Sequence, residues 1–245
     1  MFLWSLNIYV LNRETSTGSF NLQERGMHMG NIYCIMGKSA SGKDTIYKRL
    51  LDLQPVSLRS IVTYTTRPIR SEETEGVEYK FVNPDILRKM RKQGIVIEER
   101  CYHTVHGDWY YFTADDGQIK DDETYLLVQT PEGFKSLRDY YGRSRVRPIY
   151  IEVEDGLRLA RAVERERLEA IPRYTELCRR YIADEADFSE SVLLSLGIEK
   201  RYQNSDFDKC IGEISQDLKD ILKESRKNEA SQAEPGKIIY PPKKR

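Results

Sequence analysis

The segment that most constrains this chain runs from Gly37 to Thr45 and reads Gly-Lys-Ser-Ala-Ser-Gly-Lys-Asp-Thr. An apolar run at positions 32–36 precedes it, and apolar residues at helical spacing follow it. A strand, a turn bracketed by glycines and a helix N-terminus are typical of a phosphate-binding loop, because backbone N–H groups and the helix dipole converge on an anion. The pattern therefore predicts an α/β core in which Lys43 brings positive charge to a bound phosphate. An ordinary strand, turn and helix is the alternative.

Position 44 departs from the usual loop pattern, in which a Ser or Thr follows the lysine and meets magnesium. Asp44 stands there instead, and Thr45 cannot simply substitute because adjacent helix residues face different directions. Two interpretations stay open. Asp44 binds Mg²⁺ directly or through water, as carboxylates commonly do, or it only caps the helix.

Length and charge limit the classes of partner. With 245 residues, the chain can bury one substantial core and a small inserted lobe. Its 39 basic and 39 acidic residues balance, so no global field draws it to nucleic acid or to a membrane. The four cysteines, at positions 34, 101, 178 and 210, are scattered, which favours reduced and packed thiols in the cytoplasm over disulfides or a metal site.

The two ends of the sequence differ from its middle. Residues 1–11 are apolar but lack a basic leader and are too short to span a bilayer, so we expect neither export nor anchoring. Met27 and Met29 directly precede the first strand, and we predict that translation starts there and that residues 1–28 are an extension outside the core. An N-terminal arm packed on the body is the alternative. The polar residues 224–245 are predicted to form a disordered tail.

Between these ends, β-rich runs alternate with segments of helical periodicity, which indicates βαβ units and a mostly parallel sheet. The expected strands cover residues 32–36, 61–66, 79–82, 95–97, 125–130 and 149–153, with a further β-rich stretch over 102–113. The expected helices follow the loop and cover 84–93, 131–141, 155–171, a segment from 174 onward, and 207–221. The region 61–115 is predicted to be a small lobe inserted into the core.

A second candidate phosphate site follows the strand at 61–66. Arg67 and Arg70 lie three residues apart, and two guanidinium groups so placed can grip one phosphate from two sides. Thr63 and Tyr79 can donate hydroxyl hydrogen bonds to the same group. The alternative is a solvated loop whose arginines pair with the nearby acidic residues, which are Glu72, Glu73 and Glu75.

With these motifs in this order, the chain resembles the guanylate kinases, which are nucleoside-monophosphate kinases. Their acceptor phosphate is held by a segment with a serine, a Thr-Thr-Arg run and a second arginine, followed by a tyrosine; Thr63-x-Thr65-Thr66-Arg67-x-x-Arg70 matches it, with Thr63 in place of the serine. The resemblance spans Asn31 to about Leu222. It implies a three-layer P-loop NTPase fold of the α/β class over residues 29–223, with a mostly parallel sheet, an NMP-binding lobe at 61–115 and a helical lid at 155–185.

The resemblance also implies how the acceptor base is recognised. Glu98 matches the glutamate that accepts hydrogen bonds from guanine, and Tyr111-Phe112-Thr113 matches a Tyr-Gly-Thr element, with Tyr110 as an alternative match. An exposed strand glutamate and packing tyrosines are the competing interpretation. Thr130 stands where the family has an aspartate, which leaves strict guanine selectivity open. The residues assigned to the acceptor nucleotide are Thr63, Arg67, Arg70, Tyr79, Glu98, Tyr111, Thr113 and Thr130.

On the donor side, Arg161 and Arg165 lie four residues apart on one helix face and match the family's lid arginines. Arg180 matches a further family arginine better than Arg179 does, and Asn204 resembles a residue near the donor's adenine. A salt-bridged surface helix involving Glu164, Glu166 and Glu169 is the alternative. The resemblance assigns ATP to Gly37, Lys38, Ser39, Ala40, Ser41, Gly42, Lys43, Asp44, Thr45 and Asn204, and catalysis to Lys43, Arg67, Arg161, Arg165 and Arg180.

The activity implied is transfer of the γ-phosphate of ATP, with Mg²⁺, to GMP or dGMP. A kinase for another nucleoside monophosphate or for ribose bisphosphate is the nearest alternative. A non-catalytic binding module is the more distant one, because such modules have degraded phosphate loops whereas Gly42 and Lys43 are intact here. The expected partners are small-molecule nucleotides, without nucleic acid or membrane, and the expected state is a cytoplasmic monomer or homodimer.

Overall fold

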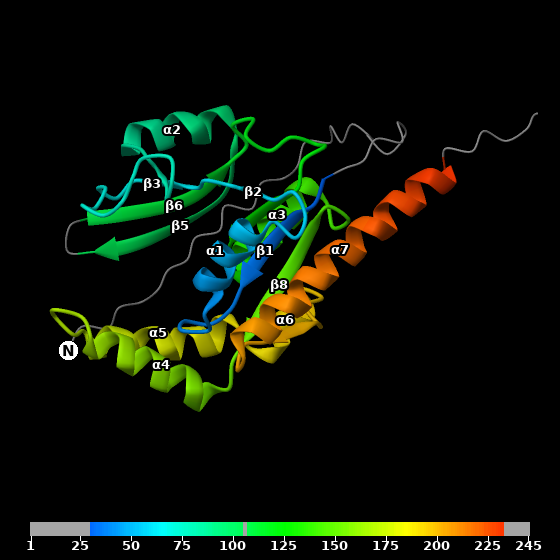
Figure 1. Ribbon diagram of the computed structural model, residues 1–245. Helices are drawn as coiled ribbons and strands as arrows, with labels where there is room; N and C mark the ends of the chain where they lie inside the picture. Colours follow the sequence, from blue (N-terminus) through cyan, green and yellow to red (C-terminus); the bar gives the residue numbers. More distant parts are fainter. Residues whose placement is uncertain (1–29, 105–106, 233–245) are drawn as a thin grey trace, which may run out of the picture.

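A five-stranded parallel sheet forms the centre of the molecule and confirms the expected α/β class. The computed structural model describes residues 30–104 and 107–232 (Figure 1). The strand order is β2-β7-β1-β8-β9, and each neighbouring pair is parallel. The strands are β1 (Ile32–Met36), β2 (Arg59–Ser60), β7 (Tyr125–Val128), β8 (Val146–Glu152) and β9 (Arg201–Gln203).

Helices cover both faces of this sheet, because its central strand is apolar on both sides. Ile32, Cys34 and Met36 of β1 point into one core cluster, while Tyr33 and Ile35 point into the other. The first cluster is completed by α3 (Pro131–Tyr141) and α6 (Glu190–Ser195), and the second by α1 (Lys43–Leu53) and α7 (Phe207–Gln232). The result is the predicted three-layer arrangement.

A small lobe with its own mixed sheet lies beside the core (Figure 1). Its helix α2 (Pro84–Gln93) has the predicted limits, because the Asn83 side chain accepts a hydrogen bond from Ile86 N at 2.9 Å and Gly94 adopts a left-handed conformation. Leu87 and Met90 of this helix pack on the sheet. The sheet order is β4-β3-β6-β5, with β3 (Tyr64–Thr65), β4 (Lys80–Phe81), β5 (Val96–Thr104) and β6 (Gly107–Ala114).

The single strand predicted over 61–66 is wrong. Arg59 and Ser60 pair with β7 in the core sheet, whereas Tyr64 and Thr65 pair with β6 in the small sheet. The residues between them carry the chain from one sheet to the other. The β-branched composition of this segment suits strands, but its pairing partners belong to two different sheets.

Two helices, α4 (Asp155–Arg167) and α5 (Tyr174–Asp187), pack together below the core and fall on the predicted lid (Figure 1). The first helix ends at Arg167 rather than at position 171. The chain turns back early because α5 returns along α4, and the Glu166 side chain accepts a hydrogen bond from Arg173 N in that turn.

The last helix extends beyond its predicted end. Helix α7 continues past Lys223 to Gln232, so the predicted disordered tail is wrong over residues 224–232. Good helix formers in this stretch propagate a helix that packing has already nucleated. Residues 1–28 and 233–245, on which the other terminal predictions fall, lie outside the described residues. No helix in the described part of the chain has both the length and the apolar character needed to cross a membrane.

Candidate active site

The phosphate loop follows β1 at the carboxyl edge of the parallel sheet, where two glycines are required by close contacts. A Cβ on Gly37 would lie 2.6 Å from the Ile151 carbonyl oxygen. Gly42 adopts a left-handed conformation, and a Cβ there would lie 2.4 Å from Asn204 Nδ2. The Asn204 amide donates a hydrogen bond to the Ser41 carbonyl oxygen at 2.7 Å. Asn204 is therefore a buried support of the loop, and its contact with a donor base stays a prediction.

The loop lysine begins α1, and its neighbour Asp44 points to solvent. Lys43 Nζ lies 3.8 Å from Asp44 Oδ2, and the Asp44 side chain is 72% exposed. The helix N-cap is Gly42 and no side chain caps it, so the interpretation of Asp44 as a cap is wrong. Its carboxylate remains available beside the loop, together with the exposed Thr45. Asp44 as a magnesium ligand stays a prediction.

Carboxylates from the lid occupy part of the loop. Ser39 N donates a hydrogen bond to Asp184 Oδ2 at 2.7 Å, and Lys38 Nζ lies 2.7 Å from Glu185 Oε1 and 3.5 Å from Asp155 Oδ1. Asp155 begins α4, whereas Asp184 and Glu185 lie near the end of α5. The loop and both lid helices are thus joined by charge in this structure.

Arg158 is the centre of that connection. Its side chain is 1% exposed, yet its guanidinium nitrogens lie 3.0 Å from Asp155, 3.3 Å from Asp184 and 2.6 Å from Glu185. The same group lies 4.0 Å from the centre of the Tyr181 ring. A buried charge needs such partners, and here they fix the base of the lid to the loop.

The second predicted phosphate site is built around Arg67, which is 4% exposed. Its guanidinium forms a bidentate pair with Glu73, with Nη1 2.6 Å from Oε2, and its Nε donates to the Tyr111 hydroxyl at 3.0 Å. Its charge lies 5.3 Å from the centres of the Tyr79 and Phe81 rings. Hydrogen bonding from Arg67 lowers the pKa of Glu73 to about 2.

The structure brings together two of the predicted phosphate ligands, Arg67 and Tyr79, and places Tyr111, which was assigned to the acceptor nucleotide through another motif, beside them. The competing interpretation of this loop was correct that Arg67 pairs with an acidic neighbour, but the pair is buried rather than solvated. Arg70 is exposed, and its backbone contacts Glu73: its N–H donates to the Glu73 carboxylate at 3.0 Å, and its carbonyl accepts from Glu73 N at 3.1 Å. Thr63 lies directly before β3, where its carbonyl accepts a hydrogen bond from Lys80 N at 2.8 Å.

Glu98, the predicted base-recognition residue, is 8% exposed and is held by side chains from both lobes. Thr113 Oγ1 donates to Glu98 Oε1 at 2.7 Å, and Gln129 Nε2 donates to the same oxygen at 3.1 Å. Arg100 Nε lies 3.5 Å from the other carboxylate oxygen. The alternative of an exposed strand glutamate is therefore wrong. Because Gln129 follows core strand β7, it also joins the small lobe to the core.

The lid arginines divide into two groups. Arg161 and Arg165 make no ion pair with any described residue, whereas Arg179 and Arg180 both bind Glu176, at 2.7 and 2.8 Å. The surface salt-bridge alternative concerned α4, where Arg167 lies 3.6 Å from Glu164, so it is correct for Arg167 but not for Arg161 or Arg165. Hydrogen bonding to Glu176 raises the pKa of Arg179.

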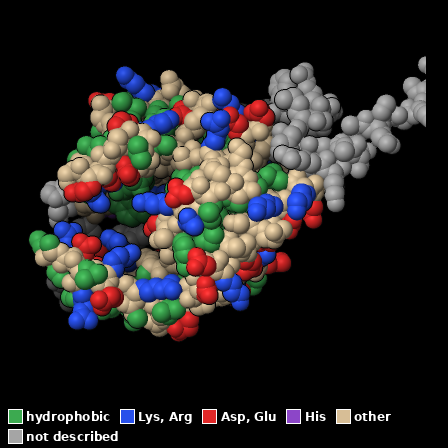
Figure 2. Space-filling view, viewed as in Figure 1, with side chains coloured by type: hydrophobic (Ala, Val, Ile, Leu, Met, Phe, Trp, Pro, Cys, Tyr) green, Lys and Arg blue, Asp and Glu red, His purple; other side chains and the backbone are tan. Residues whose placement is uncertain are grey.

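Figure 2 shows a hollow between the small lobe and the lid, with Lys and Arg side chains on its rim. A cavity of about 460 Å³ also opens beside the loop and is lined in part by Lys38, Ser41 and Arg158. Its lining holds more acidic than basic side chains. The acidic ones are Glu152, Glu154, Asp155, Glu185 and Glu190. This cavity is therefore a poor place for phosphate, and the rim of the hollow is a better one.

A sequence model of the family described as guanylate kinase matches residues 29–225. The chain belongs to the guanylate kinase family. A guanylate kinase from Geobacter metallireducens is 38% identical over 115 residues, which are 46% of this chain and 54% of that protein. One from Porphyromonas gingivalis is 29% identical over 126 residues, which are 50% of this chain and 65% of that protein.

The guanylate kinase from Syntrophotalea carbinolica is 35% identical over 81 residues, or 33% of this chain and 37% of that protein. The chain therefore spans between about a third and two thirds of the length of these curated relatives. The crystal structure of guanylate kinase from Anaplasma phagocytophilum superposes with a TM-score of 0.53 at 20% identity, covering 80% of this chain and 86% of that one. This likeness supports the guanylate kinase fold.

Two positions that differ from the family motifs have structural roles here. The Thr130 side chain accepts a hydrogen bond from Gly133 N at 3.2 Å and thereby caps α3. Phe112 takes the place of the family's glycine, is fully buried, and stacks on Tyr64 with ring centres 4.9 Å apart. Tyr110 lies under Arg91 of α2, on the opposite face from Tyr111, so Tyr111 is the better match to the family tyrosine.

Sequence reasoning missed the supporting side chains of the site. Glu73, Gln129 and Asp184 each contact a predicted site residue, and Arg158 binds the carboxylates that contact the loop. Glu73 was named only in the alternative interpretation, as one of three possible acidic partners of the loop arginines. The other three carry no local signal, because their partners lie far away along the chain.

Proposed function

We propose that this protein is a kinase that transfers the γ-phosphate of ATP to GMP or dGMP, giving GDP or dGDP. The observation that carries the proposal is the cluster of buried Arg67 with half-buried Tyr79 and Tyr111, which lies in the small lobe, whereas the phosphate loop follows the core sheet. A module that binds a single nucleotide needs one phosphate site. Phosphoryl transfer needs two sites that position donor and acceptor against each other.

On the donor side, the loop amides and Lys43 hold the triphosphate, and the unpaired Arg161 and Arg165 close on it. Arg180 joins them after release from Glu176. The Ser39 N–H donates its hydrogen bond to the Asp184 carboxylate, so a triphosphate that binds the loop displaces this carboxylate. No side-chain nucleophile is required, since the acceptor is already an anion and the protein's task is positioning and charge neutralisation.

Mg²⁺, when bound, neutralises charge on the phosphate oxygens. The residues beside the loop fit such an ion, because the exposed Asp44 carboxylate is an oxygen ligand at the helix N-terminus next to Lys43. We therefore assign the magnesium contact to Asp44.

On the acceptor side, Arg67 and Arg70 take the phosphate and Glu98 takes the base. A carboxylate accepts two hydrogen bonds from the Watson–Crick edge of guanine, which adenine cannot supply. Thr113 and Gln129 orient Glu98 for this contact. Nucleotides are the proposed ligands, and the cytoplasmic location and the monomeric or homodimeric state stay predictions.

A second candidate is a kinase for another acceptor, such as a different deoxynucleoside monophosphate or ribose bisphosphate. It is favoured by Thr130, which caps α3 and supplies no carboxylate where the family has an aspartate. Asp is an equally good N-cap, so Thr130→Asp should leave stability unchanged. If guanine is the acceptor, we expect this variant to raise the ratio of kcat/KM for GMP over AMP. An unchanged ratio in the folded variant would argue against a base contact at this position.

A coupled assay of ADP release, run across GMP, dGMP, other nucleoside monophosphates and ribose bisphosphates, tests the proposal. We expect turnover with GMP or dGMP and loss of turnover in Lys43→Ala, with Lys48→Ala on the exposed face of α1 as the control. Turnover only with another acceptor selects the second candidate. ATP binding without turnover on any acceptor supports a non-catalytic module instead.

A further inference from the structure

The β5–β6 hairpin of the small lobe carries a cluster of a thiol, an imidazole and a carboxylate that the proposed reaction does not use. Cys101 and His103 lie two residues apart on β5, so their side chains project from the same face of the strand. Asp108 on β6 is the direct cross-strand partner of His103. The strand register therefore places all three side chains together.

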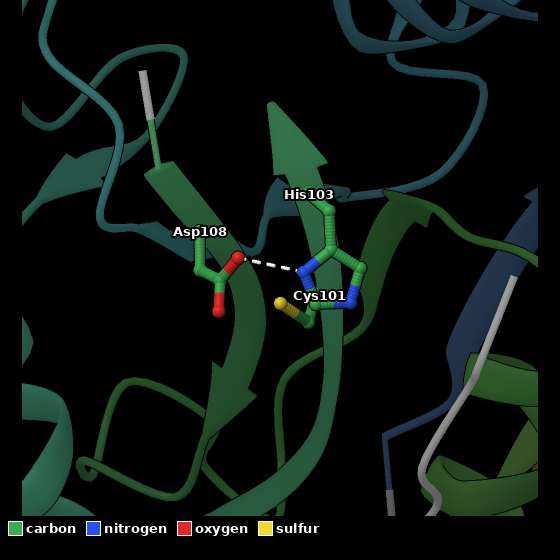
Figure 3. Close-up of side chains that lie close together, drawn as sticks. All are labelled: Cys101, His103 and Asp108. Carbon is green, nitrogen blue, oxygen red and sulfur yellow. Dashed lines mark hydrogen bonds and ion pairs between the residues drawn. The ribbon is translucent and has the colours of Figure 1, made fainter. Parts of the chain in front are cut away.

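Their ligand atoms converge. One ligand atom from each residue lies within 4.8 Å of the others, and His103 Nδ1 lies 2.6 Å from Asp108 Oδ1. In Figure 3 the Cys101 sulfur, this imidazole nitrogen and the carboxylate point toward one another on one side of the hairpin. His103 and Asp108 are about half exposed, so a hydrated ion can reach them.

We propose that Cys101, His103 and Asp108 form a binding site for a single Zn²⁺ ion. A thiolate, an imidazole and a carboxylate are the three ligand types that zinc takes in proteins, at metal–ligand distances of roughly 2.0 to 2.3 Å. A small movement of exposed side chains brings the three atoms onto one ion, whose fourth position is left to water. The ion replaces the hydrogen bond between His103 and Asp108.

The same ligand set excludes the common hard cations. Mg²⁺ and Ca²⁺ prefer oxygen ligands, and this cluster offers one carboxylate beside a sulfur and a nitrogen. The site is therefore chemically distinct from the magnesium contact assigned to Asp44. The scattered cysteine spacing predicted no metal site, because the ligands here come from both strands of a hairpin and include only one cysteine.

The location indicates what the ion does. Tyr102 lies between the two β5 ligands and projects from the opposite face, where its ring packs edge-on against Tyr111 at 5.4 Å. Tyr111 in turn accepts a hydrogen bond from Arg67. Zinc on the outer face thus ties together the two strands whose inner face forms the proposed acceptor site, without touching that site.

Cobalt substitution tests the proposal in untagged, full-length protein. Co²⁺ titrated into metal-free protein should give a thiolate-to-cobalt charge-transfer band that saturates at one ion per chain and is displaced by Zn²⁺. Cys101→Ser should abolish the band, and Asp108→Asn should weaken Co²⁺ binding by at least about tenfold. Cys178→Ser is the matched control, because Cys178 is an exposed free cysteine on α5, and the band should persist there.

A second measurement needs no variant, so it does not depend on how the mutants fold. Zn²⁺ should protect the Cys101 peptide, but not the Cys178 peptide, from alkylation as followed by mass spectrometry. Absence of a charge-transfer band, a band that survives in Cys101→Ser, or equal alkylation of both peptides with and without Zn²⁺ would each overturn the proposal. None of these readouts depends on kinase activity, so the site and the proposed function fail independently.

Discussion

Arg67 shows how a single residue sets the proposed acceptor site. Its buried guanidinium is held between Glu73, Tyr111 and two aromatic rings, so its fork is oriented before any phosphate arrives. We predict that Arg67→Ala raises the KM for the acceptor by roughly 30-fold or more with a smaller effect on kcat, because a desolvated charge contact is lost. Steady-state kinetics at saturating ATP measure both constants.

The matched control for this variant is Arg88→Ala. Arg88 is exposed on α2 and pairs with Asp85 on the same helix. Its loss should leave the KM for the acceptor unchanged. A similar KM in the Arg67 and Arg88 variants would remove Arg67 from the acceptor site.

The contribution of the Arg67–Glu73 pair to stability depends on pH, because Glu73 is titratable. Its pKa falls from an ordinary value of 4.5 to about 2 in the folded chain, chiefly through its hydrogen bonds with Arg67. A carboxyl with a lowered folded pKa stabilises the protein above its unfolded pKa, and this contribution is lost as the pH falls through the folded pKa. We therefore expect Glu73→Gln to lower the free energy of unfolding at neutral pH, by a difference that shrinks between pH 4.5 and 2.

Chemical denaturation at neutral pH and at steps below pH 4.5 measures this difference. Glu72→Gln is the control, because it changes the charge by the same amount at an exposed neighbouring position. Its free energy of unfolding should not fall by a comparable amount at neutral pH. If both variants follow the same curve, net charge rather than the pair with Arg67 explains the effect.

At the scale of elements, buried charge joins α4 to α5. Arg158 contacts carboxylates on both helices and packs on Tyr181. We predict that Arg158→Met lowers the free energy of unfolding by about 2 to 4 kcal/mol, because apolar packing is largely kept while the carboxylates lose their partner. Arg167→Met, on the exposed face of the same helix, should change it by less than about 0.5 kcal/mol. Urea denaturation measures both variants. Equal losses of unfolding free energy in the two would show that Arg158 has no special role.

Elements with local signals could be predicted from the sequence, and elements defined by distant partners could not. The limits of α2 follow from Asn83, Pro84 and Gly94, which act within one turn of their own helix. Strands β2 and β3 are two residues each, and only their partners in two different sheets define them. The end of α7 was missed because polar residues can prolong a helix without packing.

The same distinction holds for the site. Arg67, Tyr79 and Glu98 belong to motifs, and the structure places them on one lobe with Tyr111 and Thr113 beside them. Gln129 was passed over as part of a strand, although it reaches Glu98 in the other lobe. Its contribution depends on how two lobes meet, which single-sequence patterns do not encode.

At the scale of the whole molecule, the two proposed phosphate sites lie on different parts, the loop on the core sheet and Arg67 in the small lobe. The lobe and the core meet at the buried hydrogen bond from Gln129 to Glu98, while a hollow separates the lobe from the lid (Figure 2). In-line transfer brings donor and acceptor phosphates into contact and excludes water. The proposed reaction therefore requires the lid and the small lobe to approach each other.

The chain carries natural reporters for this closure. Cys101 on the small lobe is half-buried and Cys178 on the lid is exposed, whereas Cys34 and Cys210 are buried, and burial raises the pKa of the Cys210 thiol to about 11. Spin labels on Cys101 and Cys178 of zinc-free protein should report the distance between lobe and lid by double electron–electron resonance. We expect that distance to shorten when a non-hydrolysable ATP analogue, Mg²⁺ and GMP are all present, and to change less with either nucleotide alone, because closure is stabilised by contacts to both. Cys178→Ser, which carries one label, should give no dipolar signal. An unchanged distance while calorimetry shows both nucleotides bound would mean that the structure is already in its closed state.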